Sequence, residues 1–294
     1  MIAGVPTVRE YPYPHFVEDD VLQKSLLTDL RRNWPGRGAF IAEIPGNYVC
    51  NLARFCKEGF WREFTIRIVP QLVIRSLSSF AEQIEARYPG ESTFYLTNYS
   101  LMQSAGDYGG HDVHNHHYHD PMWVMTLLLY IDADAEGHSG TTIMELKDSG
   151  ADAMMDEAMV AAQTLNWHDS TKEYESVAYK QARIFGFHDN VIAYHCVKPS
   201  QPPATFGRRI LRFHVCVGLT HCERLYGVDY ATYYKMRMDP TKDPRVLEWM
   251  KKDIALLRSE KPKMSDDERV AWINKARLYL PPTEPDEENG SPDA

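Results

Sequence analysis

Five histidines fall within nine consecutive positions of the chain, and two aspartates, Asp112 and Asp120, lie among them; the histidines are His111, His114, His116, His117 and His119. Imidazole is the commonest side-chain ligand of transition metals. On a strand, residues i and i+2 share a face, so His117 and His119 would point the same way, and so would His114 and His116. The pattern predicts a metal site. A histidine-rich surface loop, or histidines hydrogen-bonded in a core, are the alternatives.

A second group of functional residues follows further along the chain. His195 lies in the stretch 190–197, and Arg208 and Arg209 come thirteen and fourteen residues later, at the start of an apolar segment. If this segment is a strand, Arg208, Ile210, Arg212 and His214 share one face, and Arg209, Leu211, Phe213 and Val215 share the other. A guanidinium at the mouth of a barrel suits a ligand carboxylate, because its planar fork can bind both oxygens. The alternative is a pair of surface arginines at the start of a strand.

The elements that would position these residues are short strands in the middle of the chain. Segments rich in β-branched and aromatic residues predict strands at 92–103, 123–131, 141–146, 183–187, 190–197 and 209–219. Several short strands in one block favour an antiparallel sandwich or barrel. A helix is expected at 152–163, inserted between strands.

Helices are expected on both sides of this block, which makes the fold class α+β. The N-terminal part predicts helices at 22–30 and 61–88, the latter broken or kinked by Pro70, and a short strand at 39–44. Near the C-terminus, Asp243 and Pro244 mark a helix start, and Ser265 with Glu268 forms a capping box. We expect one domain at 1–235, made of the strands and the N-terminal helices, a helical extension at 236–280, and a disordered acidic tail at 281–294. The extension would pack on the sheet or support a homodimer.

Composition limits the class of protein. The chain has 294 residues, of which 44% are hydrophobic, and a formal net charge of −9. This charge disfavours broad binding of nucleic acid or of an anionic membrane. No apolar run reaches the roughly 20 residues that span a bilayer. The first residues lack the pattern of a signal peptide, and the five cysteines show no C-x-x-C spacing, so we expect reduced thiols in a cytoplasmic protein.

In their order along the chain, these features resemble the Fe(II)- and 2-oxoglutarate-dependent oxygenases. Closely spaced metal-ligand candidates precede the strand 126–131, Gly140-Thr141 follows, and then comes a strand with His195, Val197 and Pro199, with an arginine downstream. The start Tyr-Pro-Tyr-Pro-His-Phe-Val at 11–17 is similar to that of many members. The resemblance covers about residues 11–219. It implies a double-stranded β-helix, or jelly-roll, core and an iron site.

This chain departs from the family pattern, which is His-x-Asp or His-x-Glu followed by a distant histidine. No histidine stands two residues before an acid, because Gly110 precedes Asp112 and Tyr118 precedes Asp120. Alignment without gaps puts the motif on His117-Tyr118-His119, and a longer loop puts it on His114-Asn115-His116. The resemblance then implies His117 and His195 as ligands, with His119 or Asp120 as the third. The pair His114 and His116 remains open.

The resemblance also implies roles for other residues. Arg208 would bind the far carboxylate of 2-oxoglutarate, with Arg209 as the second candidate. Tyr99, on an early strand, would help to line the co-substrate pocket, and Trp123 would contact the substrate. With a net negative charge and no peptide-binding repeat, we expect a small-molecule substrate.

Two other functions fit the same residues. A three-histidine, cupin-like dioxygenase that uses no 2-oxoglutarate would explain the missing acid, but not the arginines after His195. A non-catalytic jelly-roll module that binds zinc or no metal would explain the histidines alone.

Overall fold

The chain is built around two antiparallel sheets. The computed structural model describes residues 5–52, 59–104, 109–116, 120–132, 140–147, 158–160, 162, 167–199, 208–238 and 243–280. The first sheet has the strand order β1-β9-β6-β11-β4-β3-β2, and the second has the order β5-β10-β7-β8. The strands of the first are β1 (His15–Glu18), β9 (Ile184–Phe187), β6 (Trp123–Tyr130), β11 (Arg209–Cys216), β4 (Thr93–Ser104), β3 (Asn47–Asn51) and β2 (Ile41–Ile44). Those of the second are β5 (His111–His114), β10 (His195–Val197), β7 (Thr141–Leu146) and β8 (Thr171–Val177).

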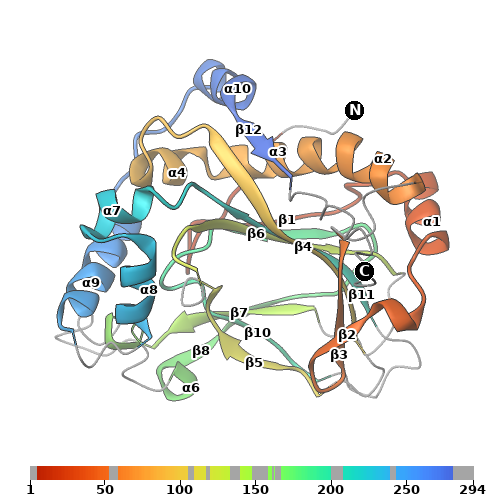
Figure 1. The fold of residues 1–294 in the computed structure, drawn as a ribbon, viewed down its shortest axis with the longest axis horizontal. Coiled ribbons are helices and arrows are strands. Elements are labelled where there is room, and N and C mark those ends of the chain that lie inside the picture. Colours follow the sequence, from red (N-terminus) through yellow and green to blue (C-terminus); the bar gives the residue numbers. More distant parts are fainter. Residues whose placement is uncertain are drawn as a thin grey trace, which may run out of the picture.

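The two sheets face each other and enclose an inner core (Figure 1). Its apolar members come from both sheets and from the N-terminal segment: Tyr13, Leu128, Tyr130, Ile143, Val177, Tyr179, Phe185, Phe187, Ala193 and Ile210. Alternate residues of β6 and β11 point into this space, as the pleat of a strand requires. The sheets therefore form a barrel-like sandwich with apolar side chains in its interior.

A second, larger core lies on the other face of the first sheet, beneath helices. Leu127 and Leu129 of β6, with Leu211 and Phe213 of β11, belong to this outer core. The helices α2 (Gly59–Arg67), α3 (Val69–Ser79) and α4 (Ala81–Arg87) run across this face of the sheet (Figure 1). Their buried apolar residues, such as Leu72 and Leu77, close the outer core. The first sheet is thus covered on both faces along its centre.

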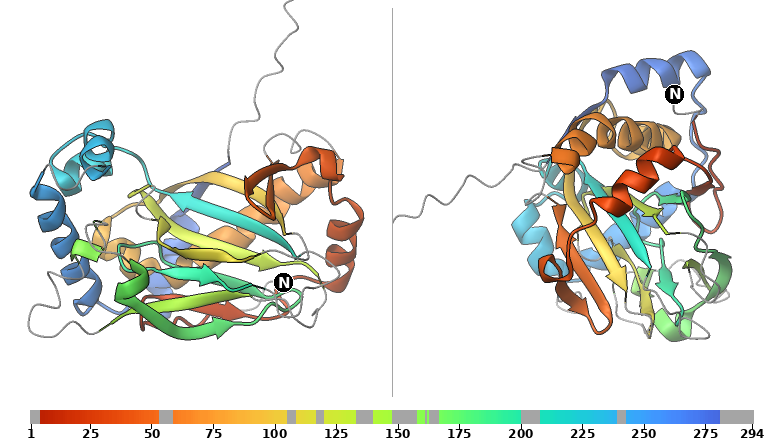
Figure 2. Two further views of the ribbon diagram at one scale, coloured as in Figure 1. Left: turned by 90° about the horizontal axis from the view of Figure 1, so that it is seen from below. Right: turned by 90° about the vertical axis from the view of Figure 1, so that its right-hand side faces the viewer.

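The other helices gather at the edges of the sheets. The helix α1 (Lys24–Arg32) follows β1, and α6 (Trp167–Ser170) precedes β8. The helices α7 (His221–Tyr226), α8 (Tyr230–Arg237) and α9 (Arg245–Arg258) lie together at one end of the sandwich (Figure 2). The helix α10 (Asp266–Lys275) packs on α3, and β12 (Arg277–Tyr279) then pairs in parallel with β4. No helix in the described ranges is both long enough and apolar enough to cross a membrane.

A buried ion pair joins the C-terminal helices to the N-terminal ones. Arg87 of α4 lies 2.9 Å from Asp253 of α9, and both side chains are almost fully buried. Tyr226 donates a hydrogen bond to the same carboxylate at 3.0 Å. The helices after residue 236 therefore pack on the N-terminal helices of the same chain. The homodimer through these helices stays a prediction.

Most predicted strands lie within a few residues of the observed ones, although one is shorter than predicted and several short strands were missed. The strand expected at 190–197 is only three residues long, because a turn held by Asn190 takes up its first half. β8 and β3 were not predicted, because their exposed faces carry too many polar residues to give a clear pattern. Pro70 does separate two helices, and it lies in the first turn of α3. Of the helix expected at 152–163, the structure describes a helical segment at 158–160.

Candidate functional site

Three histidines meet where β5 and β10 pair in the second sheet. His114 stands directly opposite His195 in the antiparallel register, and their ring centres are 4.2 Å apart. His116, two residues after His114, brings its ring within 4.6 Å of the His195 ring and 5.2 Å of the His114 ring. One nitrogen from each ring lies within 4.8 Å of the others. This trio, His114, His116 and His195, could hold one metal ion.

Main-chain hydrogen bonds orient two of these rings. Nδ1 of His195 donates to the carbonyl oxygen of Ala193 at 3.1 Å, and Nδ1 of His114 donates to that of Asp112 at 2.8 Å. A hydrogen on Nδ1 leaves the lone pair on Nε2, which is then the atom available to a metal. The carbonyl groups therefore hold both histidines in the tautomer that a ligand needs.

Burial keeps the same two rings uncharged. The pKa of His195 is lowered to about 3, first because the ring is buried and then because His116 lies beside it. The pKa of His114 is lowered well below its usual value, again mainly by burial, with a further contribution from His195. Neutral imidazoles bind metals without first losing a proton.

Behind His116 lies a second polar group, formed by Thr126, Asp189 and His214. The hydroxyl of Thr126 donates to Oδ2 of Asp189 at 2.6 Å and lies 3.0 Å from Nδ1 of His116 and 3.1 Å from Nδ1 of His214. Oδ1 of Asp189 lies 3.2 Å from Nδ1 of His116, within ion-pair distance but without the alignment of a hydrogen bond. Burial raises the pKa of Asp189 to about 7. His116, Asp189 and His214 are also close enough together to bind a cation.

The interior of the barrel changes from polar to apolar and back to polar along its length. The rings of Phe187 and His195 lie 4.8 Å apart, and Phe187 belongs to the inner core with Leu128 and Ile210. At the far end, Arg208 is 4% exposed and donates to the carbonyl oxygen of Gly140 at 3.0 Å and to the hydroxyl of Ser104 at 3.3 Å. On the inner face of β11, the buried Arg208 is thus separated from His214 by Ile210 and by Arg212, which pairs with Glu43 at 2.8 Å.

Hydroxyl groups surround this buried arginine. Tyr130 and Thr141 share a hydrogen bond of 3.0 Å, and Arg208 is close enough to lower the pKa of Tyr130, although burial raises that pKa more strongly. Gly140 approaches β8 so closely that a Cβ atom there would lie 1.7 Å from the carbonyl oxygen of Val177. Only glycine can therefore occupy position 140 in this arrangement. The prediction that Arg208, Ile210, Arg212 and His214 share a face agrees with Ile210 lying in the inner core and His214 beside His116.

The structure describes Asp120 and Trp123 among the other residues predicted for the site. His117 and His119 fall outside the described residues. Asp120 is not part of the trio: its carboxylate caps the turn at Met122, accepting from that amide at 2.9 Å, and burial raises its pKa. Trp123 stacks on His214 with 4.1 Å between ring centres, so it adjoins the site.

Tyr99 and Arg209 face away from the histidines. Tyr99 stacks on Phe213 in the outer core, with 5.3 Å between the rings. Arg209 pairs with Asp132 and lies over the ring of Trp34 at 5.4 Å. Both residues are on the helix-covered side of the first sheet, where neither can contact a ligand held in the barrel.

Sequence reasoning missed Thr126 and Asp189 and did not assign a role to His214. Thr126 looks like an ordinary β-branched residue of an apolar strand. Asp189 is followed by Asn190, and this pair is typical of an exposed turn, so the sequence did not indicate that Asp189 is buried. His214 could have been predicted as part of the site, because strand alternation puts it on the same face as Arg208.

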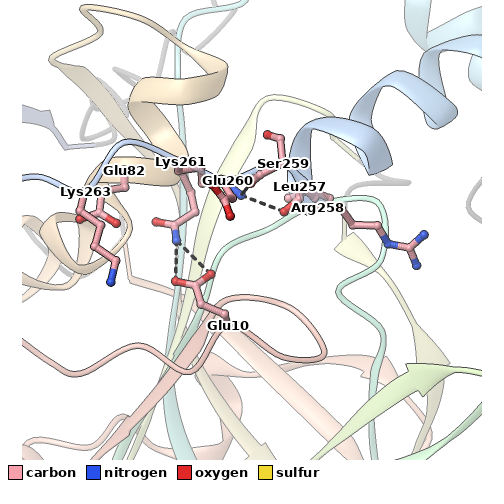
Figure 3. Close-up of a pocket in the computed structure, with 9 residues that line it drawn as sticks. Glu10, Glu82, Leu257, Arg258, Ser259, Glu260, Lys261 and Lys263 are labelled. Carbon is pink, nitrogen blue, oxygen red and sulfur yellow. Dashed lines mark hydrogen bonds between the residues drawn. The ribbon is translucent and has the colours of Figure 1, made fainter.

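A separate hollow of about 610 Å³ lies outside the barrel (Figure 3). Glu10 and Gln83 form one wall, and the end of α9 with the segment that follows it, including Lys261, forms another. Gln83 donates to Glu10 at 3.0 Å, and Lys261 donates to the carbonyl oxygen of Leu257 at 2.8 Å. The charged side chains here are mixed in sign, and none of the histidine trio lines it.

No known family model and no curated protein matches this chain. Solved structures resemble it distantly, and they include prolyl hydroxylases and a 2-oxoglutarate-Fe(II) oxygenase. A prolyl hydroxylase from Trichoplax adhaerens, in complex with a hypoxia-inducible factor peptide fragment, is 13% identical with a TM-score of 0.45, covering 69% of this chain and 83% of that one. A Pseudomonas putida prolyl-4-hydroxylase is 12% identical with a TM-score of 0.41, covering 69% and 93%. An oxidoreductase of the 2OG-Fe(II) oxygenase family from Burkholderia pseudomallei is 9% identical with a TM-score of 0.41, covering 69% and 84%.

Proposed function

We propose that this chain is a non-haem Fe(II)- and 2-oxoglutarate-dependent oxygenase that acts on a small molecule. The observation that carries the proposal is one arrangement inside the barrel. Three histidines converge at one end, apolar side chains of the inner core follow, and Arg208 is buried at the other end. A metal-chelating oxo acid with a distant carboxylate has matching chemistry at each of these three places.

The strand order supports this proposal. The central strands run β9-β6-β11-β4 in one sheet and β5-β10-β7-β8 in the other, so consecutive strands alternate between the sheets over much of the block. This alternation is what a double-stranded β-helix requires, and it brings His114 and His195 together although they are 81 positions apart. We infer that the fold is of this type.

The trio fits an iron ion in its donor chemistry and in its spacing. Imidazole nitrogens suit Fe(II), and a facial set of three ligands leaves other coordination positions open. At metal–nitrogen distances of about 2.1 Å, two ligand atoms of a facial set are about 3.0 Å apart. The present spacing of up to 4.8 Å therefore requires the rings to close in by as much as about 2 Å when the metal binds. His114, His116 and His195 would therefore hold the metal.

The remaining residues would orient and enclose the ligands. Arg208 would bind the far carboxylate of the oxo acid, because a guanidinium pairs with both carboxylate oxygens. Leu128, Ile210 and Phe187 would contact the methylene groups and exclude water from the interior. Trp123 would form a wall for the substrate beside His214. Iron and the oxo acid, when bound, would supply the chemistry: dioxygen would oxidise the oxo acid to succinate and CO₂ with one of its atoms, and the substrate with the other.

A second candidate function is favoured by the composition of the trio. Three histidines without a carboxylate are the ligand set expected of a cupin-like dioxygenase that needs no 2-oxoglutarate. This alternative gives no role to the buried arginine, so we rank it second. It predicts a metal site whose spectrum does not respond to an oxo acid.

An anaerobic titration tests the proposal. Adding Fe(II) and then 2-oxoglutarate to the protein should give a weak visible charge-transfer band, and aerobic incubation should convert 2-oxoglutarate to succinate. Arg208→Ala should abolish the response at low 2-oxoglutarate, and Arg209→Ala, on the opposite face of β11, is the matched control. Iron binding without any response to 2-oxoglutarate would favour the three-histidine dioxygenase. Tight zinc and no bound iron would favour the non-catalytic module.

A further inference from the structure

The hydroxyl of Thr126 lies at the centre of the second polar group. A threonine hydroxyl has one hydrogen and two lone pairs. Its hydrogen is donated to Oδ2 of Asp189 at 2.6 Å, so its lone pairs are left for Nδ1 of His116 at 3.0 Å and Nδ1 of His214 at 3.1 Å. The one donor position and both acceptor positions of the hydroxyl are then used. Because the hydroxyl accepts from both rings, each histidine must carry its hydrogen on Nδ1.

This arrangement argues against a metal ion between His116, Asp189 and His214. Their ligand atoms surround the Thr126 oxygen at 2.6–3.1 Å, which is the place that an ion would have to occupy. A metal would need bonds of about 2.0–2.2 Å to the same three atoms. The hydroxyl would have to leave first. The group is therefore a hydrogen-bonded support and not a second metal site.

The support acts on the metal site through one ring. With its Nδ1 hydrogen directed at Thr126, His116 has its lone pair on Nε2, the atom that remains for the trio. The carboxylate of Asp189 lies 3.2 Å from Nδ1 of the same ring and is completely buried. A carboxylate behind a ligating histidine fixes the orientation of the ring and makes it a stronger donor.

We propose that Thr126 and Asp189 are positioning residues for His116, and that Asp189 supplies from behind this ring the negative charge that the trio of histidines lacks. The inference rests on the metal site of the proposed function and deepens it. A site of three neutral ligands leaves Fe(II) with its full double charge, and a buried anion one ring away offsets part of it. The carboxylate that is missing from the ligand set is thus present behind one of the ligands.

The fold holds Asp189 in this place with main-chain contacts. The amide of Asp189 donates to the carbonyl oxygen of Val124 at 3.2 Å, in β6. Asn115, which lies between His114 and His116, donates to the carbonyl oxygen of Asn190 at 2.9 Å. The segment that carries two ligands is therefore tied to the segment that carries the carboxylate, so the ring and its anionic partner are held together before any metal binds.

The first test compares two replacements of Thr126 by their affinity for Co(II), measured by competition with a chelator. Thr126→Val keeps the shape but loses the hydroxyl, and it should weaken Co(II) binding about 10- to 100-fold and change the d–d absorption bands. Thr126→Ser keeps the hydroxyl and should restore both. Thr65→Val is the control, because Thr65 is also buried and donates to Tyr99 at 3.2 Å in the outer core. It should leave Co(II) binding unchanged.

The second test removes the charge. Asp189→Asn keeps the size of the side chain, and it should weaken Co(II) binding by a similar factor. Because both changes act through His116, the double variant with Thr126→Val should lose much less than the product of the two single effects. Two unconnected structural defects would instead multiply.

These measurements use the metal alone, so they separate the two proposals. Wild-type protein that binds Co(II) but ignores 2-oxoglutarate would overturn the proposed function and leave this inference standing. Wild-type affinity in both Thr126→Val and Asp189→Asn would overturn the inference alone, as would single effects that multiply. Wild-type protein that binds no divalent metal would overturn both.

Discussion

The two faces of the first sheet are built from the same strands but differ in the residues that they carry and in what they contact. Along β6, Leu127 and Leu129 point into the outer core, while Thr126, Leu128 and Tyr130 point into the barrel. The outer face is largely apolar and is covered by α2, α3 and α4. The inner face mixes apolar residues with a threonine and a tyrosine whose hydroxyls are hydrogen-bonded.

This difference separates stability from function. Burial of apolar surface stabilises the fold in proportion to the area removed from water, so the large outer core contributes most of the stability. Buried polar groups contribute less, and they are costly when they lose a partner. The inner face can therefore hold metal ligands only because the outer face keeps the strands in place. Mutations on the inner face should mainly lower the affinity for metal, and mutations on the outer face should mainly lower the free energy of unfolding.

The largest effect on metal binding should come from His195→Ala. Structural zinc sites gain about 10–16 kcal/mol from four ligands, so the loss of one ligand should cost about 3–4 kcal/mol, or roughly a 10²- to 10³-fold loss of affinity. Because burial holds the pKa of His195 at about 3, the ring is uncharged near neutral pH, and the metal-free variant should lose only the packing and hydrogen bond of a neutral side chain. Metal titration and denaturant unfolding would measure the two quantities.

The result that contradicts this assignment is stoichiometric metal in His195→Ala. His221→Ala is a suitable control, because His221 is a partly buried histidine that pairs with Glu91 away from the barrel. It should bind metal like the wild type.

The opposite signature should come from Leu77→Ala in α3. Leu77 is completely buried in the outer core, and removing three of its side-chain carbons should lower the free energy of unfolding by about 2–5 kcal/mol. The metal affinity of the folded fraction should not change, because the barrel interior is not touched. Unfolding in urea and metal titration at low temperature would test this. A parallel loss of metal affinity would show that the two faces are coupled.

The sequence predicted the outer face of the fold better than the inner one. Alternation in the segment 209–216 correctly separated Arg209, on the outside, from Arg208, on the inside. It works because successive side chains of a strand point to opposite faces, so two neighbouring arginines must lie on different sides of the sheet. The density of histidines at 111–119 also pointed to a metal site, and two members of that cluster, His114 and His116, do meet His195 in the barrel.

What the sequence could not give is which histidines meet. The register between β5 and β10 puts His114 opposite His195, and that pairing depends on contacts between segments about 80 residues apart. Counting positions from the strand at 126–131 assumes a loop of fixed length and favours His117, which lies outside the described residues and stays a prediction. The role of Asp189 could not be predicted for the same reason: it is far from His116 in the sequence, and only the folded chain brings the two together.

The third prediction sets the two arginines at the start of β11 against each other. Hydrogen bonds to a charged group are worth about 1.5–3 kcal/mol, so Arg208→Ala should raise the 2-oxoglutarate concentration needed for half-maximal turnover about 10- to 100-fold. Arg209→Ala should change it less than about threefold, because its guanidinium binds Asp132 on the outer face. Steady-state succinate formation would measure both. Equal effects would mean that the barrel does not hold the co-substrate in the orientation we propose.

The smallest effect concerns His188, which faces the outer core while its neighbour Asp189 faces the inner one. His188 lies against Phe80 at 6.0 Å, is 1% exposed, and has no hydrogen-bond partner for either ring nitrogen among the residues that the structure describes. Burial lowers its pKa to about 3. The unfolded chain takes up this proton near pH 6.5 and the folded chain does not, so stability falls as the pH drops from about 6.5 towards 3.

At pH 5 this one histidine should cost about 2 kcal/mol relative to pH 7.5. His188→Leu removes the titrating group, so its free energy of unfolding should fall by about 2 kcal/mol less than that of the wild type between the two pH values. The buried His195 adds to the acid sensitivity, and Asp189, whose pKa is raised to about 7, opposes it, but both are present in the two proteins and cancel in the comparison. At pH 7.5 the variant should be at least as stable as the wild type, because an apolar side chain replaces a buried polar one. An equal decrease of the free energy of unfolding in both proteins would contradict this prediction. It would mean that water reaches the ring of His188 in the folded chain.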